Sequence, residues 1–246
     1  MENFIKKAVE LIKNSSYLSA FTGAGISVES GIPPFRGRNG LWNKYDPSLF
    51  EIDYYLSHPA ESWKLIITLF YETFARTAPN RAHEVLAALE KQGMLKALIT
   101  QNIDSLHYRA GSRNIVEYHG NSRDLVCTKC GAVRTLEPQL LKNDIPYCSC
   151  SGLLKPNFVF FGELIPEKAI VDSENIISRT DMMLVIGTTG LVYPAAFLPH
   201  AAKERGAVIV EINPEESEYT HSITDIFLPG PAAEIMDTLG NKLVQA

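Results

Sequence analysis

Four cysteines are the residues in this sequence whose type and spacing point most directly to a chemistry. The chain of 246 residues contains only four, Cys127, Cys130, Cys148 and Cys150, in the pattern C-x2-C-x17-C-x-C. Two close pairs joined by a loop can place four thiolates at the corners of a tetrahedron, the geometry of structural zinc sites. Because four thiolates leave no open coordination position, we expect a structural Zn²⁺ that does not activate water. Ordinary buried cysteines or a disulfide pair are the alternatives.

A glycine-rich turn, TGAGIS at residues 22–27, predicts a phosphate-binding site. It lies between a strand-like segment and a predicted helix start, and its small residues would let backbone N–H groups approach a pyrophosphate. The next glycine is Gly31, so the spacing G-x-G-x5-G departs from the G-x-G-x-x-G of dehydrogenases. The turn therefore favours nucleotide binding without hydride transfer, and a purely structural turn is the alternative.

Polar side chains that could orient a ligand or move a proton follow two further strand-like segments. The segment TQNID at residues 100–104 offers amide and carboxylate groups at a strand end, where α/β proteins place ligand contacts. Its alternative role is to cap the following helix. His119 follows another apolar segment and could be a general base, because the pKa of imidazole lies near neutrality. A hydrogen-bonded structural histidine is the alternative.

A scaffold must position these candidates, and the hydrophobic pattern predicts an α/β fold with a parallel sheet. Asn80 is the predicted cap of one helix, and the segment from Ser30 to Pro47 has no clear period, which predicts a long functional loop. The predicted strands are 17–21, 95–100, 115–118, 158–161, 182–187, 207–212 and 225–228, and the predicted helices are 3–14, 59–74, 81–91, 167–178, 194–205 and 232–243, with another beginning near Asp104.

The composition excludes several classes of protein. Hydrophobic residues make up 46% and charged residues 21%, as in globular proteins, which argues against disorder and coiled coil. The length predicts one large domain with a small module. A net charge of −5 lacks the positive field that nucleic acid requires, so we expect no direct nucleic-acid partner. With no membrane-length apolar run and no export signal, we expect no membrane association and a cytoplasmic location.

The motifs occur in the order found in sirtuins, and the chain resembles this family over nearly all of its length. They are TGAGIS at 22–27, GIPPFRG at 31–37, TQNID at 100–104, YHG at 118–120, the four cysteines, FFGE at 160–163, GTT at 187–189 and EIN at 211–213. The resemblance implies an NAD⁺-dependent protein-lysine deacylase with a Rossmann-like parallel-sheet large domain and a small domain made of a zinc-binding module and a helical module.

The resemblance also implies domain limits. Residues 1–30, 80–120 and 158–246 would form the discontinuous Rossmann-like NAD-binding domain. Residues 31–79 would form the cofactor-binding loop and helical module, and residues 121–157 the zinc-binding module with the four cysteines as ligands. NAD⁺, as co-substrate, and an acylated lysine would meet in the cleft between the two domains.

The resemblance assigns roles to individual residues. His119 would be the general base and Asn102 a second catalytic residue, Phe35 would cover the nicotinamide ribose, and Asp104 would hold the carboxamide. The residues implied to bind NAD⁺ are Gly23, Ala24, Gly25, Ile26, Phe35, Arg36, Gln101, Asn102, Ile103, Asp104, Gly187, Thr188, Thr189, Asn213 and Ala233.

An acetylated-lysine protein or peptide would bind as an extended strand between two segments, 159–162 and 190–193, by β-augmentation. The residues implied to contact it are Val159, Phe160, Phe161, Gly162, Glu163, Gly190, Leu191 and Val192. Desuccinylating sirtuins carry a Tyr-x-x-Arg pair where this chain has apolar residues around Ile66 to Phe70, so succinyl groups would be disfavoured. A plain helix core is the alternative reason for that apolar stripe.

The implied reaction removes an acetyl group, or a longer aliphatic acyl group, from lysine, consumes NAD⁺ and releases nicotinamide and O-acyl-ADP-ribose. Two departures from the usual pattern are Pro34, where the family commonly has aspartate, and Thr189, where serine is common. A mono-ADP-ribosyltransferase is the alternative within the enzyme class. A non-catalytic NAD-sensing, peptide-binding module is the alternative from another class.

Overall fold

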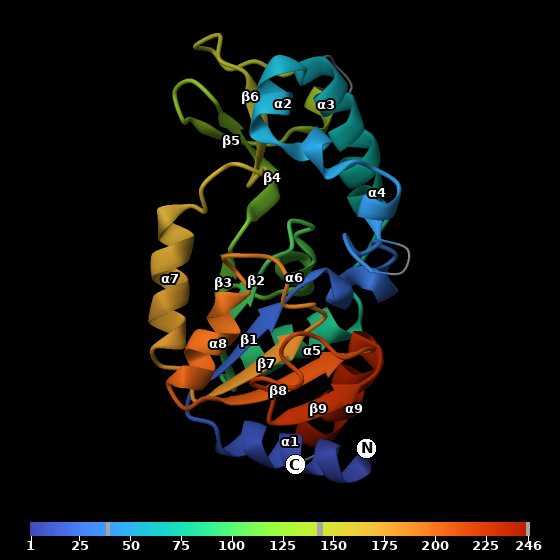
Figure 1. The fold of residues 1–246 in the computed structure, drawn as a ribbon, viewed down its shortest axis with the longest axis vertical. Helices are drawn as coiled ribbons and strands as arrows, with labels where there is room; N and C mark the ends of the chain where they lie inside the picture. Colours follow the sequence, from blue (N-terminus) through green and yellow to red (C-terminus); the bar gives the residue numbers. More distant parts are fainter. Residues whose placement is uncertain (38–39, 142–144, 245–246) are drawn as a thin grey trace.

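The computed structural model describes residues 1–37, 40–141 and 145–244, which form two lobes (Figure 1). The larger lobe contains a six-stranded sheet and the smaller lobe a three-stranded sheet. Two positions of the predicted cofactor loop, 38–39, and three of the predicted zinc module, 142–144, lie outside the described residues.

The sheet of the large lobe is entirely parallel and has the order β3-β2-β1-β7-β8-β9. Its strands are β1 (Leu18–Thr22), β2 (Leu95–Thr100), β3 (Ile115–Glu117), β7 (Met182–Ile186), β8 (Val208–Asn213) and β9 (Ile226–Pro229). The strand order reverses between β1 and β7, and α/β proteins bind ligands at the carboxyl ends of strands beside such a switch point. The prediction of an α/β fold with a parallel sheet is confirmed.

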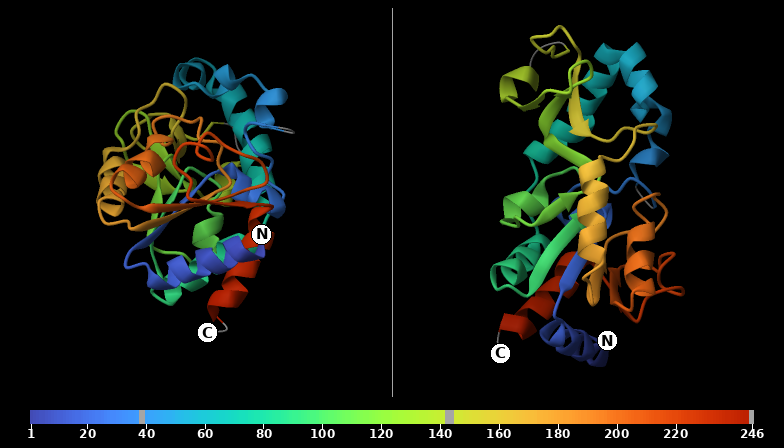
Figure 2. Two further views of the ribbon diagram at one scale, coloured as in Figure 1. Left: turned by 60° about the horizontal axis from the view of Figure 1, so that its bottom comes forward. Right: turned by 90° about the vertical axis from the view of Figure 1, so that its left-hand side faces the viewer.

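Helices cover both faces of this sheet, because successive side chains of a strand point to opposite sides. On β1, Ala20 belongs to one core and Phe21 to the other. Helices α1 (Glu2–Asn14), α5 (Arg81–Lys91) and α9 (Ala232–Val244) pack on the first face, where α1 and α9, blue and red in Figure 2, lie side by side. Helices α7 (Glu167–Ile177) and α8 (Phe197–Glu204) pack on the other.

Helix α5 begins at the predicted cap. The side chain of Asn80 accepts a hydrogen bond from the N–H of Ala82 at 3.0 Å, and the Asn80 N–H donates to the His83 ring at 3.3 Å. This reciprocal arrangement satisfies two backbone groups that a helix start would otherwise leave unpaired. The short helix α6 (Leu106–Ala110) follows β2, close to the predicted start.

The small lobe combines an antiparallel sheet, in the order β5-β4-β6, with a helical part. The sheet contains β4 (Gly120–Cys127), β5 (Val133–Thr135) and β6 (Leu154–Phe158), and the helices are α2 (Ile52–Ser57), α3 (Pro59–Ile66) and α4 (Glu72–Ala75). The predicted helix 59–74 is interrupted by a π-helical turn, Ile67–Tyr71, a feature frequent near functional sites. One hydrophobic core unites the sheet and the helices.

The connection from β6 back to the large lobe differs from the prediction. A strand was expected over 158–161, but β6 ends at Phe158, and the backbone of Phe161 pairs with the loop before α2 instead. Its N–H donates to the Phe50 carbonyl and its carbonyl accepts from the Ile52 N–H, both at 3.0 Å. The continuous apolar run of this segment does not reveal where the chain changes its pairing partner. The predicted loop also contains short 3₁₀ turns, Leu41–Asn43 and Pro47–Phe50.

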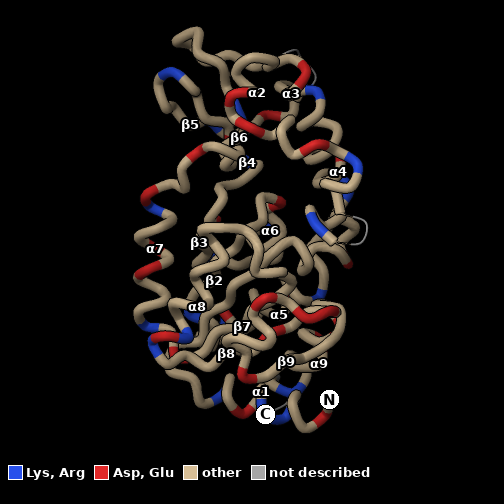
Figure 3. Tube along the Cα trace, in the orientation of Figure 1, with Lys and Arg blue, Asp and Glu red and all other residues tan. Residues whose placement is uncertain are grey.

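Charged residues are distributed over both lobes. Lys and Arg alternate with Asp and Glu along the described chain (Figure 3), in keeping with the small net charge of −5. Among the helices of residues 1–37, 40–141 and 145–244, none is both long and apolar enough to cross a membrane.

Candidate active site

A cavity of about 1090 Å³ opens at the carboxyl ends of the parallel strands and is walled by both lobes. Such a volume lies at the upper end of the range for ligand sites. The predicted residues that line it are Gly23, Ala24, Gly25, Phe35, Arg36, Gln101, Asn102, Ile103, His119, Val159, Phe160, Phe161, Gly162, Glu163, Gly187, Thr188, Thr189, Val192 and Asn213. The topology thus brings together segments that are far apart in the sequence.

The remaining predicted residues lie beside the cavity. Ile26 is buried in the core, and Asp104 borders a small adjoining cavity of about 20 Å³. The N–H of Ala233 donates to the Glu29 carboxylate at 2.6 Å. Gly190 and Leu191 precede Val192, which does line the cavity.

The glycine-rich turn is packed against the loop that follows β7. The N–H of Gly25 donates to the Gly187 carbonyl at 2.8 Å, and a Cβ added at Gly25 would lie 2.6 Å from the Gly187 Cα. Gly187 has a φ of +63°, and its own Cβ would lie 2.2 Å from the Ile26 nitrogen. These glycines are therefore required for two backbones to approach each other. Of the turn's lining residues, Ala24 keeps an N–H without a partner in the described structure.

His119 lies between the two lobes and is held by one hydrogen bond of its ring and one of its backbone. Its Nδ1 lies 3.0 Å from the Gln101 carbonyl, which can only accept, so Nδ1 carries the proton and Nε2 has a free lone pair. Its carbonyl accepts from the Val159 N–H at 2.9 Å. Burial lowers the pKa of His119 below its ordinary value, and the Gln101 bond opposes this shift. The neutral imidazole can therefore accept a proton near pH 7.

Asn102 is held rigidly by its amide nitrogen. Its Nδ2 donates to the Gly23 carbonyl at 3.1 Å and to the Ser27 hydroxyl at 3.3 Å. No described residue bonds Oδ1, which remains able to accept a hydrogen bond from a ligand or water. The Ser27 hydroxyl donates in turn to Asp104 at 2.7 Å. Ser27 is a functional residue that the sequence analysis did not single out, although it belongs to the TGAGIS motif.

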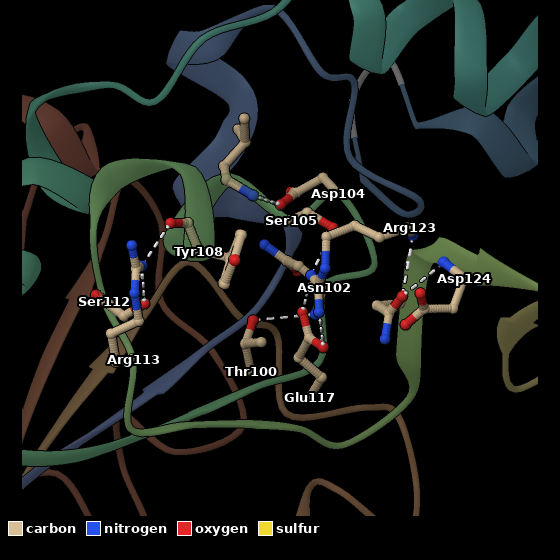
Figure 4. A network of polar contacts seen from close by, with 12 residues as sticks. Thr100, Asn102, Asp104, Ser105, Tyr108, Ser112, Arg113, Glu117, Arg123 and Asp124 are labelled. Atoms are coloured by element: carbon tan, nitrogen blue, oxygen red, sulfur yellow. Dashed lines mark hydrogen bonds and ion pairs between the residues drawn. The ribbon is translucent and has the colours of Figure 1, made fainter. Parts of the chain in front are cut away.

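Asp104 caps the start of α6, which is the alternative role that the sequence analysis gave for the TQNID segment. Its Oδ1 accepts the N–H of Leu106 at 2.8 Å, and burial raises the pKa of this carboxyl despite that bond. With both oxygens engaged by the protein, Asp104 fixes the strand-to-helix turn that carries Asn102. Figure 4 shows Asn102, Asp104 and Ser105 along this turn.

A salt bridge braces the segment that carries His119. Arg123 on β4 binds Glu117 on β3 through two contacts, 2.5 and 2.7 Å, and donates to the Ser105 hydroxyl at 2.8 Å (Figure 4). Its guanidinium lies over the Tyr108 ring, 4.8 Å from the centroid. Glu117 precedes His119 and Arg123 follows it in the sequence. Their ion pair therefore links the two ends of the bend that contains the histidine.

The four cysteines gather at the far end of β4. Their Sγ atoms all lie within 4.8 Å of one another, with 3.5 Å between Cys127 and Cys150 and 3.9 Å between Cys130 and Cys148. A tetrahedron with Zn–S arms of about 2.3 Å has edges of about 3.8 Å, whereas a disulfide needs about 2.05 Å. The cluster therefore fits zinc, and the four thiols are free, which excludes the disulfide alternative.

The loops around the cluster are shaped to hold a metal. The N–H groups of Cys130 and Lys129 point at the Cys127 sulfur at 3.5 and 3.4 Å and lower the pKa of that thiol, which favours the thiolate that zinc requires. A Cβ at Gly152 would lie 2.5 Å from the Cys127 sulfur. Only glycine therefore fits beside the sulfur cluster at this position.

An aromatic wall on the small-lobe side of the cavity was not predicted. Phe35 lies 5.3 Å from Trp42, and Trp42 lies 5.2 Å from Phe50, measured between ring centroids. Phe70, from the π-helical turn, completes this wall, and all four residues line the cavity. Their aromatic character was visible in the sequence, but their convergence depends on packing between separate segments.

The cavity fits a dinucleotide. Several of its polar groups have no hydrogen-bond partner among the described residues, including His119 Nε2, Asn102 Oδ1 and the Ala24 N–H at the strand ends. The fold and the site together define an α/β protein that can hold a dinucleotide between a parallel sheet and a small lobe with a four-cysteine zinc site.

Comparison with known proteins identifies the family. Residues 23–194 match the Sir2 family. An NAD-dependent protein deacylase from Pyrococcus furiosus is 43% identical over 246 residues, covering 95% of this chain and 96% of that protein. An NAD-dependent protein deacetylase from Sulfolobus acidocaldarius is 44% identical over 218 residues, covering 87% and 85%.

Solved structures agree with this assignment. A Sir2 homologue in complex with NAD has a TM-score of 0.91 at 42% identity, covering 98% of this chain and 94% of that one. A Sir2 complex with a p53 peptide and NAD⁺ has a TM-score of 0.89 at 35% identity, covering 98% and 99%. The chain belongs to the Sir2 family, the sirtuins.

Proposed function

We propose that this chain is an NAD⁺-dependent protein-lysine deacylase that removes acetyl groups. The observation that carries the proposal is His119, whose Nδ1–H is committed to the Gln101 carbonyl and whose Nε2 is free in a dinucleotide-sized cavity. The deacylase and deacetylase names of relatives above 40% identity support it, as do the Sir2 complexes with NAD and a p53 peptide.

In this proposal the acyl oxygen bonds to the ribose C1′ of NAD⁺ as nicotinamide leaves. One water molecule then enters, so that free lysine and O-acyl-ADP-ribose are released. His119 Nε2 takes the proton from a ribose hydroxyl, and the Gln101 carbonyl stabilises the imidazolium that forms. Asn102 Oδ1 accepts a hydrogen bond from a hydroxyl or a water and orients it.

NAD⁺ would bind along the strand ends of the large lobe. Residues at the ends of β1 and β2, on the loop after β7 and at the end of β8 are the proposed contacts, with Phe35 and Arg36 closing over them. The proposed domain division is 1–30, 80–120 and 158–246 for the NAD-binding domain, and 31–79 and 121–157 for the small one. The presence of two lobes supports this division, although Phe158 and Phe160 pack in the small-lobe core. The cytoplasmic location stays a prediction from the sequence.

An acyl-lysine peptide would bind in an extended form between segments 159–163 and 190–192. In the first segment, the Val159 carbonyl and the Gly162 N–H have no partners among the described residues. The Glu163 side chain is turned inward, 3.0 Å from Lys155 and 2.8 Å from the Phe160 N–H. We therefore propose that the backbone of this segment, rather than the Glu163 carboxylate, contacts the peptide.

The preference of the enzyme for one acyl group over another tests whether the aromatic wall forms an apolar acyl pocket. Phe70 lines the cavity, and both Phe70 and Ile66 belong to the small-lobe core, which supports an apolar pocket at Phe70. Among the described residues, Arg36 is the one Lys or Arg side chain that lines the cavity. We expect kcat/KM for an acetyl-lysine peptide to exceed that for its succinyl analogue by more than about tenfold, because a carboxylate would be buried without a partner.

The measurement is nicotinamide release from matched acetyl, succinyl and myristoyl peptides of one sequence. The myristoyl peptide should be accepted, since the wall is apolar. Succinyl turnover equal to acetyl turnover would show that Arg36 or another cation neutralises the acid, and the proposed pocket would be wrong.

The pH profile should report His119. Because burial lowers its pKa below the ordinary value of about 6.5, the imidazole is neutral at pH 7. Activity should be flat near neutrality and fall about tenfold per pH unit once the pH drops below this lowered pKa, where the base is protonated. The measurement is kcat/KM against pH, with ADP-ribose affinity recorded as a control for acid damage. An apparent pKa well above 6.5 on the acid limb would contradict the assignment.

A further inference from the structure

Glu211, near the end of β8, is a fully buried carboxylate surrounded by donors. It is 0% exposed, and no described Lys or Arg forms an ion pair with it. One oxygen accepts from Asn213 Nδ2 at 2.9 Å and the Ser217 hydroxyl at 2.5 Å. The other accepts from the hydroxyls of Thr220 and Thr224 at 2.9 and 2.7 Å. Four donors match a carboxylate, which only accepts.

These contacts pin one loop to the sheet. Residues 214–225, which we call the β8–β9 loop, connect β8 to β9. The Glu211 carboxylate accepts hydrogen bonds from three positions of this loop, Ser217, Thr220 and Thr224. Part of this loop, Pro214 to Ser217, lines the large cavity. The loop also contacts the segment between β7 and α8, because the Glu218 N–H donates to the Thr189 carbonyl at 3.2 Å and the Tyr219 hydroxyl to the Ala196 carbonyl at 3.0 Å.

The same carboxylate fixes the orientation of the Asn213 amide. One hydrogen of Nδ2 goes to Glu211 and the other to the Thr188 carbonyl at 3.0 Å. Oδ1 is therefore the free end of the amide, and Asn213 lines the cavity. An acceptor fixed in this way suits a hydroxyl of a ribose.

Packing alone does not explain a carboxylate at this position. A methionine would fill a similar volume, and burying a charge without a cation is costly. All four groups that offset this cost belong to residues 213–224. We propose that Glu211 is a positioning residue for dinucleotide binding, which orders the β8–β9 loop and directs Asn213 Oδ1 at the ligand. This inference rests on the proposed function.

The test compares ADP-ribose affinity, by calorimetry on the zinc-loaded protein, in the wild type and in Glu211→Met and Glu211→Gln. We expect Glu211→Met to raise Kd about tenfold, because four donors lose their acceptor and the loop loses its anchor. Glu211→Gln keeps one acceptor oxygen and should recover part of the affinity. The KM of the acetyl-lysine peptide should stay within about twofold of wild type in Glu211→Gln.

Ile209→Val is the matched control, since Ile209 is fully buried on the same face of β8 and contacts no part of the cavity. It should lower the melting temperature without changing Kd. If Glu211→Met does not fold, Thr224→Val removes one donor outside the cavity and should raise Kd about twofold to threefold.

The positioning role would be overturned if Glu211→Met and Glu211→Gln both have a lowered melting temperature but bind ADP-ribose with the wild-type Kd. If Glu211→Met does not fold, wild-type Kd in both Glu211→Gln and Thr224→Val would overturn it. Wild-type protein that fails to bind ADP-ribose would instead overturn the proposed function, so the two failures are distinguishable.

Discussion

Replacing His119 with alanine should lower kcat/KM for deacetylation of an acetyl-lysine peptide by about 10²- to 10⁴-fold, the usual loss when a general base is removed. Nε2 of this residue is the free base in the cavity, because Nδ1 is bound to the Gln101 carbonyl. Affinity for ADP-ribose should change by less than about threefold, since the polar groups at the other strand ends are untouched. The effect should therefore fall on kcat.

The measurement is steady-state nicotinamide release combined with calorimetry for ADP-ribose. His58→Ala is the matched control: this exposed histidine lies in the small lobe, stacked on Tyr54, and does not line the cavity. It should keep full activity. A His119→Ala protein that retains more than about a tenth of wild-type kcat/KM would show that another group is the base.

Replacing Cys148 with serine should release zinc and destabilise the small lobe. Metal binding to four thiolates is coupled to folding, and losing one ligand removes much of that free energy. A loss of several kcal/mol corresponds to a fall in melting temperature of about 10 °C or more for a chain of this size. Activity should fall as well, because Phe50, Phe70 and Phe158 of this lobe wall the cavity.

Elemental analysis and thermal unfolding provide the measurement. Ser149→Ala changes the exposed neighbour of Cys148 and should keep both the metal and the melting temperature. His119 itself is unchanged in Cys148→Ser, so restoring zinc binding through a reverse substitution should restore activity. Wild-type protein without stoichiometric metal would contradict the structural zinc site.

Local sequence signals predicted the scaffold well. The apolar runs gave β2 and β8 to within a residue or two, and Asn80 marked the start of α5. The cysteine spacing predicted the zinc cluster, because four ligands to one ion must converge whatever the rest of the fold does. The glycines of the phosphate turn were predicted to let the backbone approach a ligand, which stays a prediction. The structure shows that they also let two protein loops approach each other closely.

Features that depend on distant contacts could not be predicted. The aromatic wall joins a loop, a 3₁₀ turn and a π-helical turn, and no single segment carries a signal for it. Residues 159–163 look like a strand, but within this segment only the Phe161 backbone pairs with the segment at the start of α2. Glu211 was noted only as part of the EIN motif, and only the fold shows that it is buried and surrounded by donors from the β8–β9 loop.

The most direct test of the proposed function is the coupling of deacetylation to NAD⁺ consumption. Purified protein is incubated with an acetyl-lysine peptide, with and without NAD⁺, and deacetylated peptide and nicotinamide are counted by mass spectrometry. We predict one nicotinamide for each lysine deacetylated, and no deacetylation when NAD⁺ is omitted. The proposed function would be contradicted if deacetylation continues without NAD⁺. It would also be contradicted if nicotinamide is released while ADP-ribose stays attached to protein and the peptide stays acetylated.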